Sequence, residues 1–210
     1  MSGKTEAAAR ARRDSYHHGN LRQGLIEAAL AIVAEQGLAA VTLRACASRA
    51  GVSHAAPAHH FGNLQGLLSE LAAVAFRRFH ATIAAEQAAA GPDPRAQLAA
   101  AGCGYLRFAT ANPDLFRLMF SAGRLDWTNT TLAEASRAAY RQLADTVRPF
   151  QRDPDDEEEG VRLRTLVWSM VHGYAHLLLE GYLAQHGVSA DGLSHLPDIA
   201  ALLPYPPSDG

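Results

Sequence analysis

Apolar residues recur every three or four positions over most of this chain, and no stretch alternates strictly between apolar and polar residues. The first such pattern runs from Asn20, a residue that caps helices well, to about Gln36, and Gly37 is expected to end the helix. Similar patterns follow along the rest of the sequence. Together they predict an all-α protein.

Two short apolar patterns lie close together between Leu38 and Leu68. Thr42 can cap the first, in which one apolar face recurs over two turns at Leu43, Cys46, Ala47 and Ala50. Gly51 suits the left-handed residue that ends a helix, and Ser53 can cap the second short helix. Two short helices joined by a tight turn that contains Gly predict a helix-turn-helix, whose second helix fits the major groove of DNA.

A long fourth helix is expected directly after this motif. Asn63 can cap it, and over residues 64–89 it would be about 39 Å long, enough to lead into a second domain. Gly91-Pro92-Asp93-Pro94 ends it, and residues 153–159 give a later helix an acidic start that suits the helix dipole. The later helices are expected over residues 95–111, 113–122, 130–150, 161–185 and 191–203, with Pro197 bending or splitting the last.

Many residues around the helix-turn-helix stand at a characteristic spacing: Val41-Thr42-Leu43-Arg44, Ala47, Ala50-Gly51-Val52-Ser53, Ala56, His60-Phe61 and Leu67-Leu68. With them, residues 16–70 resemble the DNA-binding domain of the TetR (tetracycline-repressor-like) family of bacterial transcription regulators. Tyr16-His17-His18-Gly19 resembles the segment before the first helix in a subset of that family. The resemblance implies a three-helix DNA-binding domain joined by the fourth helix to a helical ligand-binding and dimerisation domain.

A second group of residues lies in the carboxy-terminal part: Tyr105, Phe108, the run from Asn112 to Phe120, Trp168 and His172-Gly173. It resembles the ligand domain of a TetR subgroup that is recognised by a Trp and a His-Gly at this spacing (WHG). Carboxy-terminal domains vary widely in the family, so this second resemblance says less about function than the first.

The helix-turn-helix supplies eight candidate DNA contacts. Alanine can meet thymine methyl groups and histidine can exchange hydrogen bonds with bases, so base contacts are expected from His54, Ala55, Ala58 and His59. Phosphate contacts, helped by helix amino termini that point at the DNA backbone, are expected from Thr42, Arg44 and Ser53. Thr42 and Ser53 can cap helices at the same time. His60 is either a phosphate contact or a packing residue.

Three residues depart from the pattern of the family. Ala58 stands where a phosphate-binding Tyr is usual, and Leu64 stands where a Lys usually opens the fourth helix. Pro57 replaces an apolar residue, and in a helix capped by Ser53 it would remove the first internal hydrogen bond, to the Ser53 carbonyl. Fewer phosphate contacts predict weaker and less salt-dependent DNA binding.

The resemblance implies a small-molecule effector, with eight candidate ligand-binding residues: Tyr105, Phe108, Phe116, Met119, Phe120, Trp168, His172 and His176. Such residues at helical spacing can equally form solid core, and His172 can anchor a ligand or make a buried hydrogen bond between helices. His172, His176 and Glu180 share one helix face as metal ligands would, but Gly173 stands where an H-E-x-x-H zinc hydrolase has its glutamate. We therefore expect no metal, no cofactor and no enzymatic activity.

The charge distribution agrees with a DNA-binding amino-terminal part and an acidic carboxy-terminal part. Residues 1–80 hold nine Lys and Arg against five Asp and Glu, whereas the rest of the chain holds ten against sixteen. Cys46 and Cys103 lie far apart, so neither a disulfide nor a zinc site is expected. The sequence shows neither a membrane-spanning apolar run nor a signal peptide, which predicts a cytoplasmic protein.

These observations predict a homodimeric transcription regulator of the repressor kind, which a small molecule releases from a palindromic operator in double-stranded DNA. Residues 1–65 would bind DNA, and residues 66–210 would bind the effector and dimerise, with helices at about 156–186 and 191–203 pairing with their two-fold mates. One alternative is a small-molecule-binding protein whose DNA-binding domain no longer functions. A metal-dependent enzyme that uses His172, His176 and Glu180 is the other alternative.

Overall fold

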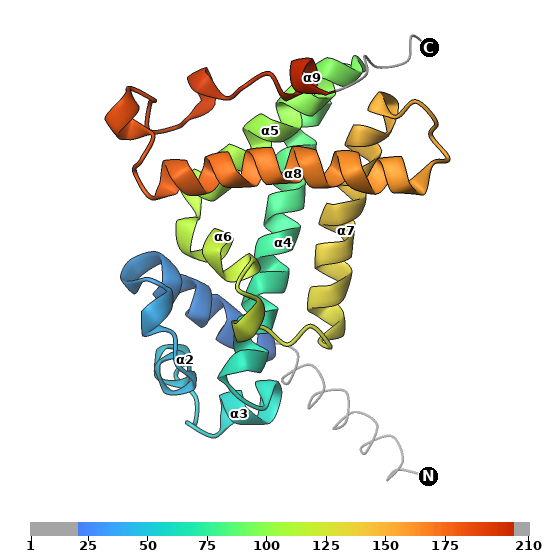
Figure 1. The fold of residues 1–210 in the computed structure, drawn as a ribbon. Helices are drawn as coiled ribbons and strands as arrows, with labels where there is room; N and C mark the ends of the chain where they lie inside the picture. Colours follow the sequence, from blue (N-terminus) through green and yellow to red (C-terminus); the bar gives the residue numbers. More distant parts are fainter. Residues whose placement is uncertain (1–20, 204–210) are drawn as a thin grey trace, which may run out of the picture. The chain divides into compact units, whose positions relative to one another are not determined.

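The computed structural model describes residues 21–203, and every regular element within them is helical (Figure 1). The described part of the first helix covers residues 21–36. The α-helices that follow are α2 (Leu43–Ala50), α3 (Ala56–Phe61), α4 (Leu64–Ala89), α5 (Pro94–Ala111), α6 (Pro113–Met119), α7 (Thr130–Val147), α8 (Glu157–Leu179) and α9 (Ile199–Leu202). The prediction of an all-α fold is confirmed.

Short 3-10 turns lie between several of these helices: η1 (Leu38–Ala40), η2 (Ala122–Arg124), η3 (Arg148–Phe150), η4 (Ala184–His186) and η5 (Leu193–His195). The expected cap at Asn20, the segment from Tyr16 to Gly19 and the two tails lie outside the described residues.

By its internal contacts the chain divides into two compact units. The amino-terminal unit contains the residues up to Ala72 together with Ser121–Asn129. The carboxy-terminal unit contains Ala73–Phe120 and the residues from Thr130 onward, so α4 begins in one unit and ends in the other. The division of function at residue 65 stays a prediction.

Helix α2 begins and ends where the sequence predicts. Thr42 caps it, since its Oγ1 accepts a hydrogen bond from the Ala45 amide at 3.0 Å. Gly51 follows at φ 67°, in the left-handed region, and the Val52 amide donates to the Ala47 carbonyl at 3.0 Å. These are the contacts of a Schellman motif, which satisfies carbonyls that the end of a helix leaves unpaired.

The start of α3 differs from the prediction. The Ser53 carbonyl accepts a hydrogen bond from the Ala56 amide at 3.0 Å, and Ala55 takes the N-cap position with no side-chain hydrogen bond. Pro57 has no N–H to donate to Ser53, so the chain makes a separate turn and the helix begins at Ala56. Pro57 then lies in the first turn, where no internal donor is needed, and its ring is buried. The expected capping by Ser53 and the expected loss of a helical hydrogen bond are therefore wrong.

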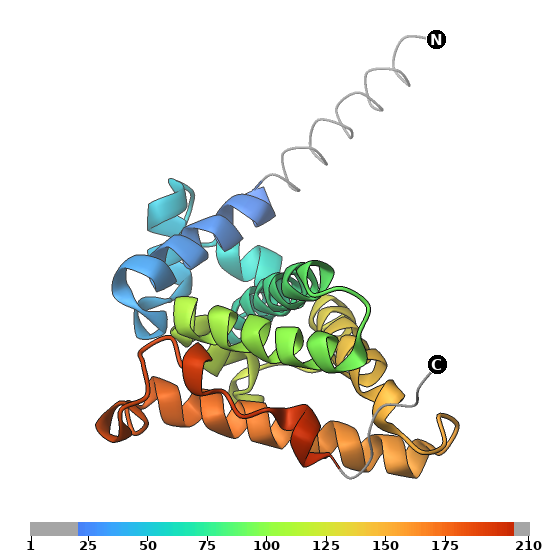
Figure 2. The ribbon, with the colours of Figure 1, turned by 90° about the horizontal axis from the view of Figure 1, so that it is seen from above.

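In the carboxy-terminal unit, α8 packs across α5 and α7, and Figure 2 shows α5 and α8 as adjacent layers. The core is filled by large side chains with less than 2% exposure, among them Leu106, Phe116, Leu118, Met119, Leu132, Val147 and Phe150. Gly104 allows α5 to approach α4 closely, because a Cβ at this position would lie 2.7 Å from the Ile83 Cα.

The helix ends in the second half of the chain are earlier than the sequence predicts. Helix α6 ends at Met119 and α7 at Val147, where Pro149 cannot donate to the next helical carbonyl. Helix α8 starts from an Asp156 cap, and ends at Leu179 because Gly181 adopts φ 77°. The Tyr182 amide then closes the turn on the Leu177 carbonyl at 3.1 Å.

The helix expected over residues 191–203 is not formed as one element. Pro197 separates the 3-10 turn η5 from α9, and Asp198 caps α9, whose Ala201 amide donates to the Asp198 Oδ1 at 3.2 Å. Ile199 and Ala200 are buried, and α9 packs on α5 of the same chain. The prediction of one long terminal helix is therefore wrong, whereas the pairing of this segment with a two-fold mate stays a prediction.

Candidate functional site

The eight predicted DNA contacts lie together on the helix-turn-helix, and seven of them are exposed: Thr42, Arg44, Ser53, His54, Ala55, Ala58 and His59. Within residues 21–203 no carboxylate pairs with Arg44, whereas the neighbouring Arg49 is held by Glu35, with Nη1 and Oε2 2.7 Å apart. Arg44 is thus the arginine of α2 that can reach a phosphate without first losing an ion pair. The contacts with DNA themselves stay predictions.

His60 is half buried and lies between two other rings. Its ring centroid is 5.6 Å from that of His59 and 6.3 Å from that of Phe61. Of the two roles that the sequence left open for His60, packing therefore has support in the structure, and a phosphate contact stays a prediction.

Helix α3 is the second helix of the helix-turn-helix and is called the reading helix below, since it is the one predicted to contact bases. It is attached to a charged network that the sequence pattern does not predict. Glu70 of α4 is 2% exposed, and its Oε1 accepts from Arg22 Nη2 at 2.7 Å and from Asn129 Nδ2 at 2.8 Å. The same Arg22 guanidinium lies over the ring of Phe61, the last residue of α3, at 5.5 Å from its centroid. A buried carboxylate is costly unless it is paired, so this pairing ties the first helix, α3 and α4 together. A Glu inside the apolar run Leu67–Ala73 was the available sequence signal.

The segment Ser121–Asn129 joins the amino-terminal unit through α4. Gln65 Nε2 donates to the Leu125 carbonyl at 3.2 Å, and the Asp126 amide donates to the Ser69 Oγ at 2.8 Å. Leu125 and Ser69 are buried. This segment follows α6 in the chain, so a piece of the carboxy-terminal sequence forms part of the unit that carries the helix-turn-helix. Nothing in the local sequence pattern predicts it.

The predicted ligand-binding residues form a cluster of rings in the carboxy-terminal unit, here called the aromatic cluster: Tyr105, Phe108, Phe116, Met119, Phe120, Trp168, His172 and His176. Tyr105, Phe108, Phe116 and Met119 are between 0 and 6% exposed. The ring centroids of Phe120 and His172 lie 4.5 Å apart, and those of Tyr105 and Phe116 lie 5.6 Å apart. These side chains therefore pack against one another as core does, and their contact with an effector stays a prediction.

A hydrogen bond inside this cluster joins α5 to α8. The Tyr105 hydroxyl lies 2.6 Å from His172 Nδ1. Burial raises the pKa of Tyr105, and burial together with the charge of His176 lowers the pKa of His172 to about 4. At neutral pH the phenol therefore keeps its proton and the imidazole is neutral. In the tautomer that carries its proton on Nε2, the Tyr105 hydroxyl donates a hydrogen bond to Nδ1. This interhelical bond is one of the two roles that the sequence left open for His172.

Two of the three residues that the metal-enzyme alternative requires are bonded to other side chains. His172 is bonded to Tyr105, and Glu180 Oε1 accepts from Arg117 Nη2 at 3.0 Å. In the part of the chain that the structure describes, no three His, Cys, Asp or Glu side chains are arranged to hold a metal ion.

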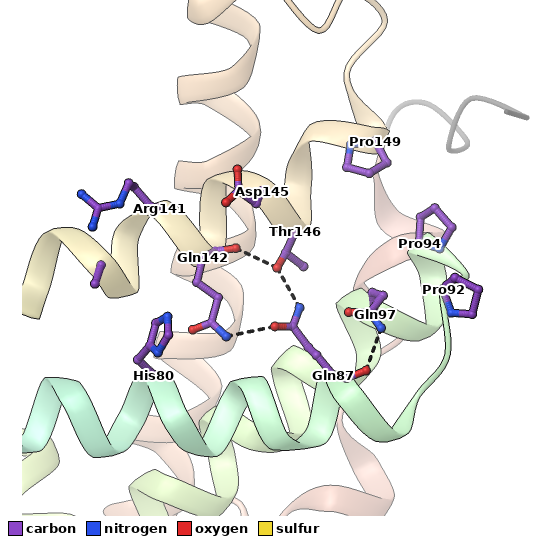
Figure 3. A pocket seen from close by; sticks show the side chains of 11 residues that line it. His80, Gln87, Pro92, Pro94, Gln97, Arg141, Gln142, Asp145, Thr146 and Pro149 are labelled. Carbon is purple, nitrogen blue, oxygen red and sulfur yellow. Dashed lines mark hydrogen bonds between the residues drawn. The ribbon is translucent and has the colours of Figure 1, made fainter.

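A cavity of about 470 Å³ lies elsewhere in the carboxy-terminal unit, between the later part of α4, the start of α5 and α7 (Figure 3). Three glutamines, a threonine and three prolines form most of its wall, and no residue of the aromatic cluster lines it. We call it the polar cavity. Its residues come from three helices, the loop before α5 and the turn η3, at no motif spacing, so no signal in the sequence marks it.

Helix α8 also presents exposed apolar side chains on its surface. Val161, Leu166, Trp168 and Leu177 are between 39 and 48% exposed. Gly173 lies among them, and a Cβ there would meet nothing within 4 Å. No helix within residues 21–203, α8 included, is both long and apolar enough to cross a membrane.

Comparison with known families gives two matches along the chain. Residues 25–71 match the model described as bacterial regulatory proteins, tetR family. Residues 98–196 match the model described as tetracyclin repressor-like, C-terminal domain. The WHG subgroup of the carboxy-terminal domain stays a prediction.

Similar individual proteins include the HTH-type transcriptional regulator BetI of Stenotrophomonas maltophilia, which is 31% identical over 122 residues, or 58% of this chain. The chain spans about three fifths of that relative, 62% of its length. A structure of a protein with unknown function from Rhodococcus sp. RHA1 has a TM-score of 0.70 at 30% identity, over 89% of this chain and 93% of that one. The structure of the TetR family transcriptional regulator PfmR from Thermus thermophilus has a TM-score of 0.52 at 21% identity. The match covers 78% of this chain and 95% of that one, and it shows a common fold.

Proposed function

This chain belongs to the tetR family of bacterial regulatory proteins, and on that premise we propose that it is a ligand-responsive, DNA-binding transcription regulator of the repressor kind. It would act as a homodimer on a palindromic operator, and in the cytoplasm, where that DNA lies. The observation that carries the proposal is the exposure of four side chains at α3. His54 and Ala55 lie directly before the helix, and Ala58 and His59 lie on it. Phe61 and Arg22 attach this helix to its unit.

The base-reading role is tested with the full chain on the DNA upstream of its own gene. Replacing both His54 and His59 by Ala removes two exposed base contacts, at about 1–3 kcal/mol for each lost readout. The expected result is loss of preference for the operator over scrambled DNA in an electrophoretic shift assay. His186→Ala, which removes an exposed imidazole of the carboxy-terminal unit, is the matched control and should bind normally.

The phosphate role of Arg44 is tested by titration at several salt concentrations. Because Arg44 is exposed and has no ion pair among residues 21–203, Arg44→Ala should weaken binding to all sequences alike. The dependence of the logarithm of the binding constant on the logarithm of the salt concentration should also become less steep, by about the amount expected for one lost phosphate contact. If Arg44→Ala changed only the preference among bases, the phosphate and base roles would be reversed.

One finding favours the alternative in which the DNA-binding domain no longer functions. Ala58 is exposed where the family has a Tyr, and Leu64 is 37% exposed where it has a Lys, so two polar side chains are missing from the surface that would face DNA. Failure of the unmodified protein to shift any upstream DNA at low salt would support that alternative. An enzymatic role is not proposed, because regulators of this family are generally not enzymes.

We propose that the homodimer forms through α8. Its exposed Val161, Leu166, Trp168 and Leu177 would be covered by a second copy, and Gly173 would allow the two helices to approach closely. Gly173→Leu should leave the monomer folded, because Gly173 is exposed and an added Cβ meets nothing within 4 Å. The variant should break the dimer in light scattering at micromolar concentration. Ala88→Leu, on an exposed position of α4, is the control and should remain dimeric.

The effector would bind in the carboxy-terminal unit and act on DNA binding through the chain connections between the units. Two connections support this route: α4 begins directly after the reading helix, and Ser121–Asn129 follows α6 and contacts Ser69 and Glu70. Thermodynamic linkage requires that an effector which lowers operator affinity is itself bound more weakly in the presence of operator, by about 5- to 150-fold. Calorimetry of effector binding with and without operator tests this; equal affinity would mean that the sites are not coupled.

A further inference from the structure

The polar cavity has an unusual wall for a small-molecule site. Most such sites are lined mainly by apolar and aromatic groups, with a few polar groups that fix the ligand. Here the amides of Gln87, Gln97 and Gln142 and the hydroxyl of Thr146 converge from α4, α5 and α7 (Figure 3). Its volume of about 470 Å³ nevertheless lies in the range of sites that hold a small molecule.

Most hydrogen-bonding groups of this wall are used within the protein. Gln142 Nε2 donates to Gln87 Oε1 at 3.0 Å, and Gln87 Nε2 donates to Thr146 Oγ1 at 2.9 Å. The Thr146 hydroxyl donates in turn to the Gln142 carbonyl at 2.8 Å, and Gln97 Nε2 donates to the Gln87 carbonyl at 2.7 Å. This chain of bonds fixes the orientation of each amide.

One acceptor is left over from this network. Gln142 Oε1 is buried and, within the described part of the chain, has no hydrogen-bond partner. Its direction is set by the bond that the same amide makes through Nε2 to Gln87. In Figure 3 it points toward His80, another residue of the cavity wall. A buried acceptor without a partner costs free energy, so a molecule that brings an N–H or O–H donor gains by reaching this atom. Oε1 is closed off from solvent in this conformation, so such a molecule reaches it only when a neighbouring side chain of the wall turns aside.

The rim of the cavity is charged. Arg141 and Asp145 are exposed residues one turn apart on α7, and both line the cavity. Asp145 Oδ1 lies 3.7 Å from Arg148 Nη2, whereas no carboxylate of the described residues pairs with Arg141. The rim therefore offers a free guanidinium for an acceptor oxygen of a ligand, while the prolines of the wall add no donors of their own.

We propose that the polar cavity is the effector site, and that it takes a small hydrophilic molecule of the size of a sugar or nucleoside. The ligand presents an oxygen to Arg141, turns the His80 side chain aside, and donates an O–H or N–H to Gln142 Oε1. The effect of this ligand on DNA binding rests on the proposed function, whereas its binding to the polar cavity does not.

The position of the cavity in the chain gives it a route to the DNA-binding unit. Gln87 lies on α4, which begins beside the reading helix, and Gln142 lies on α7, which begins directly after Asn129 of the Glu70 network. A ligand bound against both glutamines stabilises one spacing of the two helices that lead into the amino-terminal unit. The aromatic cluster has no part in this route.

The test uses the full chain without DNA and a panel of named probes: D-ribose, D-glucose, myo-inositol, adenosine and uridine, with indole and toluene as apolar comparators. At 100 times its dissociation constant, a bound hydrophilic probe should raise the melting temperature by roughly 5–10 °C. Stabilisation by none of the five hydrophilic probes, or by indole and toluene alone, overturns the proposal.

Variants then locate the binding site by calorimetry. Ala138→Met fills the cavity without touching its hydrogen bonds and should weaken the probe by about tenfold or more. Ala139→Met, its half-buried neighbour outside the wall, is the matched control and should bind normally. Gln142→Leu removes the free acceptor and should weaken the probe roughly two- to tenfold.

A further variant separates the two regions of the unit. Phe120→Ala, in the half-buried part of the aromatic cluster and outside the proposed dimer interface, should leave probe binding unchanged. The opposite pattern, with binding lost in Phe120→Ala and kept in Ala138→Met, overturns the proposal and places the effector in the aromatic cluster. Failure of the unmodified protein to bind DNA contradicts the proposed function, whatever the cavity binds, so the two outcomes are distinguishable.

Discussion

The aromatic cluster and the polar cavity lie in the same unit, and they differ in how completely their side chains fill space. In the cluster, Phe116 and Met119 are fully buried and rings lie in contact. In the cavity, the amides of Gln87 and Gln142 bond to each other and leave about 470 Å³ beside them. Apolar side chains gain free energy by closing every gap, whereas polar side chains with fixed hydrogen bonds keep their directions and can border an open space.

The largest expected effect comes from removing a ring of the aromatic cluster. Phe116→Ala deletes a fully buried side chain and should lower the free energy of unfolding by about 3–5 kcal/mol. His80→Ala, at the wall of the polar cavity, should cost less than about 1 kcal/mol because His80 is only half buried. Urea denaturation at one fixed protein concentration measures both, and equal losses would mean that the cluster is not tightly packed.

The next effect concerns the single hydroxyl inside the cluster. Tyr105→Phe removes the hydroxyl beside His172 Nδ1, and this nitrogen of the half-buried imidazole then loses its hydrogen-bond partner. The expected loss is about 1–3 kcal/mol in the free energy of unfolding at pH 7. A second effect of Tyr105→Phe distinguishes the loss of the hydrogen bond from a simple loss of packing. The pKa of His172 should rise, because the lone pair of Nδ1 no longer accepts a hydrogen bond and is free to bind a proton.

The same histidine predicts a dependence of stability on pH. In the folded protein the pKa of His172 is lowered to about 4 by burial and by His176, while in the unfolded chain it stays near its ordinary value of about 6.5. Between these values the unfolded chain binds the extra proton, so stability falls as the pH drops from about 6.5 to about 4. Melting temperatures across that range should fall less steeply for His172→Gln, and parallel curves for the two proteins would contradict the assignment.

Elements that depend on local chemistry could be predicted from the sequence. The caps at Thr42 and Asn63 involve residues three positions away, so α2 and α4 begin where the capping residues indicate. The left-handed glycine at Gly51 likewise fixes the end of α2. The exposure of His54 and His59 follows from the same local pattern.

Features that depend on distant contacts could not be predicted. The burial of Ile199 where α9 packs on α5 is one such feature, since these helices lie far apart in the sequence. The pairing of Glu70 with Arg22 and Asn129 joins residues up to 59 positions apart. The polar cavity could not be predicted for a different reason. Its glutamines are scattered over three helices at no motif spacing, whereas the aromatic residues with a recognisable spacing lie in another part of the same unit.

The smallest expected effect is the sharpest comparison of the two regions, because it repeats one chemical change in each. Thr146→Val removes the hydroxyl that accepts from Gln87 Nε2, much as Tyr105→Phe removes the hydroxyl that donates to His172. The polar cavity has room for several waters, at about 30 Å³ each, so water can replace the lost partner of Gln87. The loss should therefore stay below about 1 kcal/mol, less than for Tyr105→Phe. Thr82→Val, whose hydroxyl donates only to the Arg78 carbonyl of its own helix, measures the cost of losing a helical side-chain bond alone. If Thr146→Val cost as much in urea denaturation as Tyr105→Phe, water would not reach the cavity wall, and the cavity would be as closed to a hydrophilic ligand as the aromatic cluster.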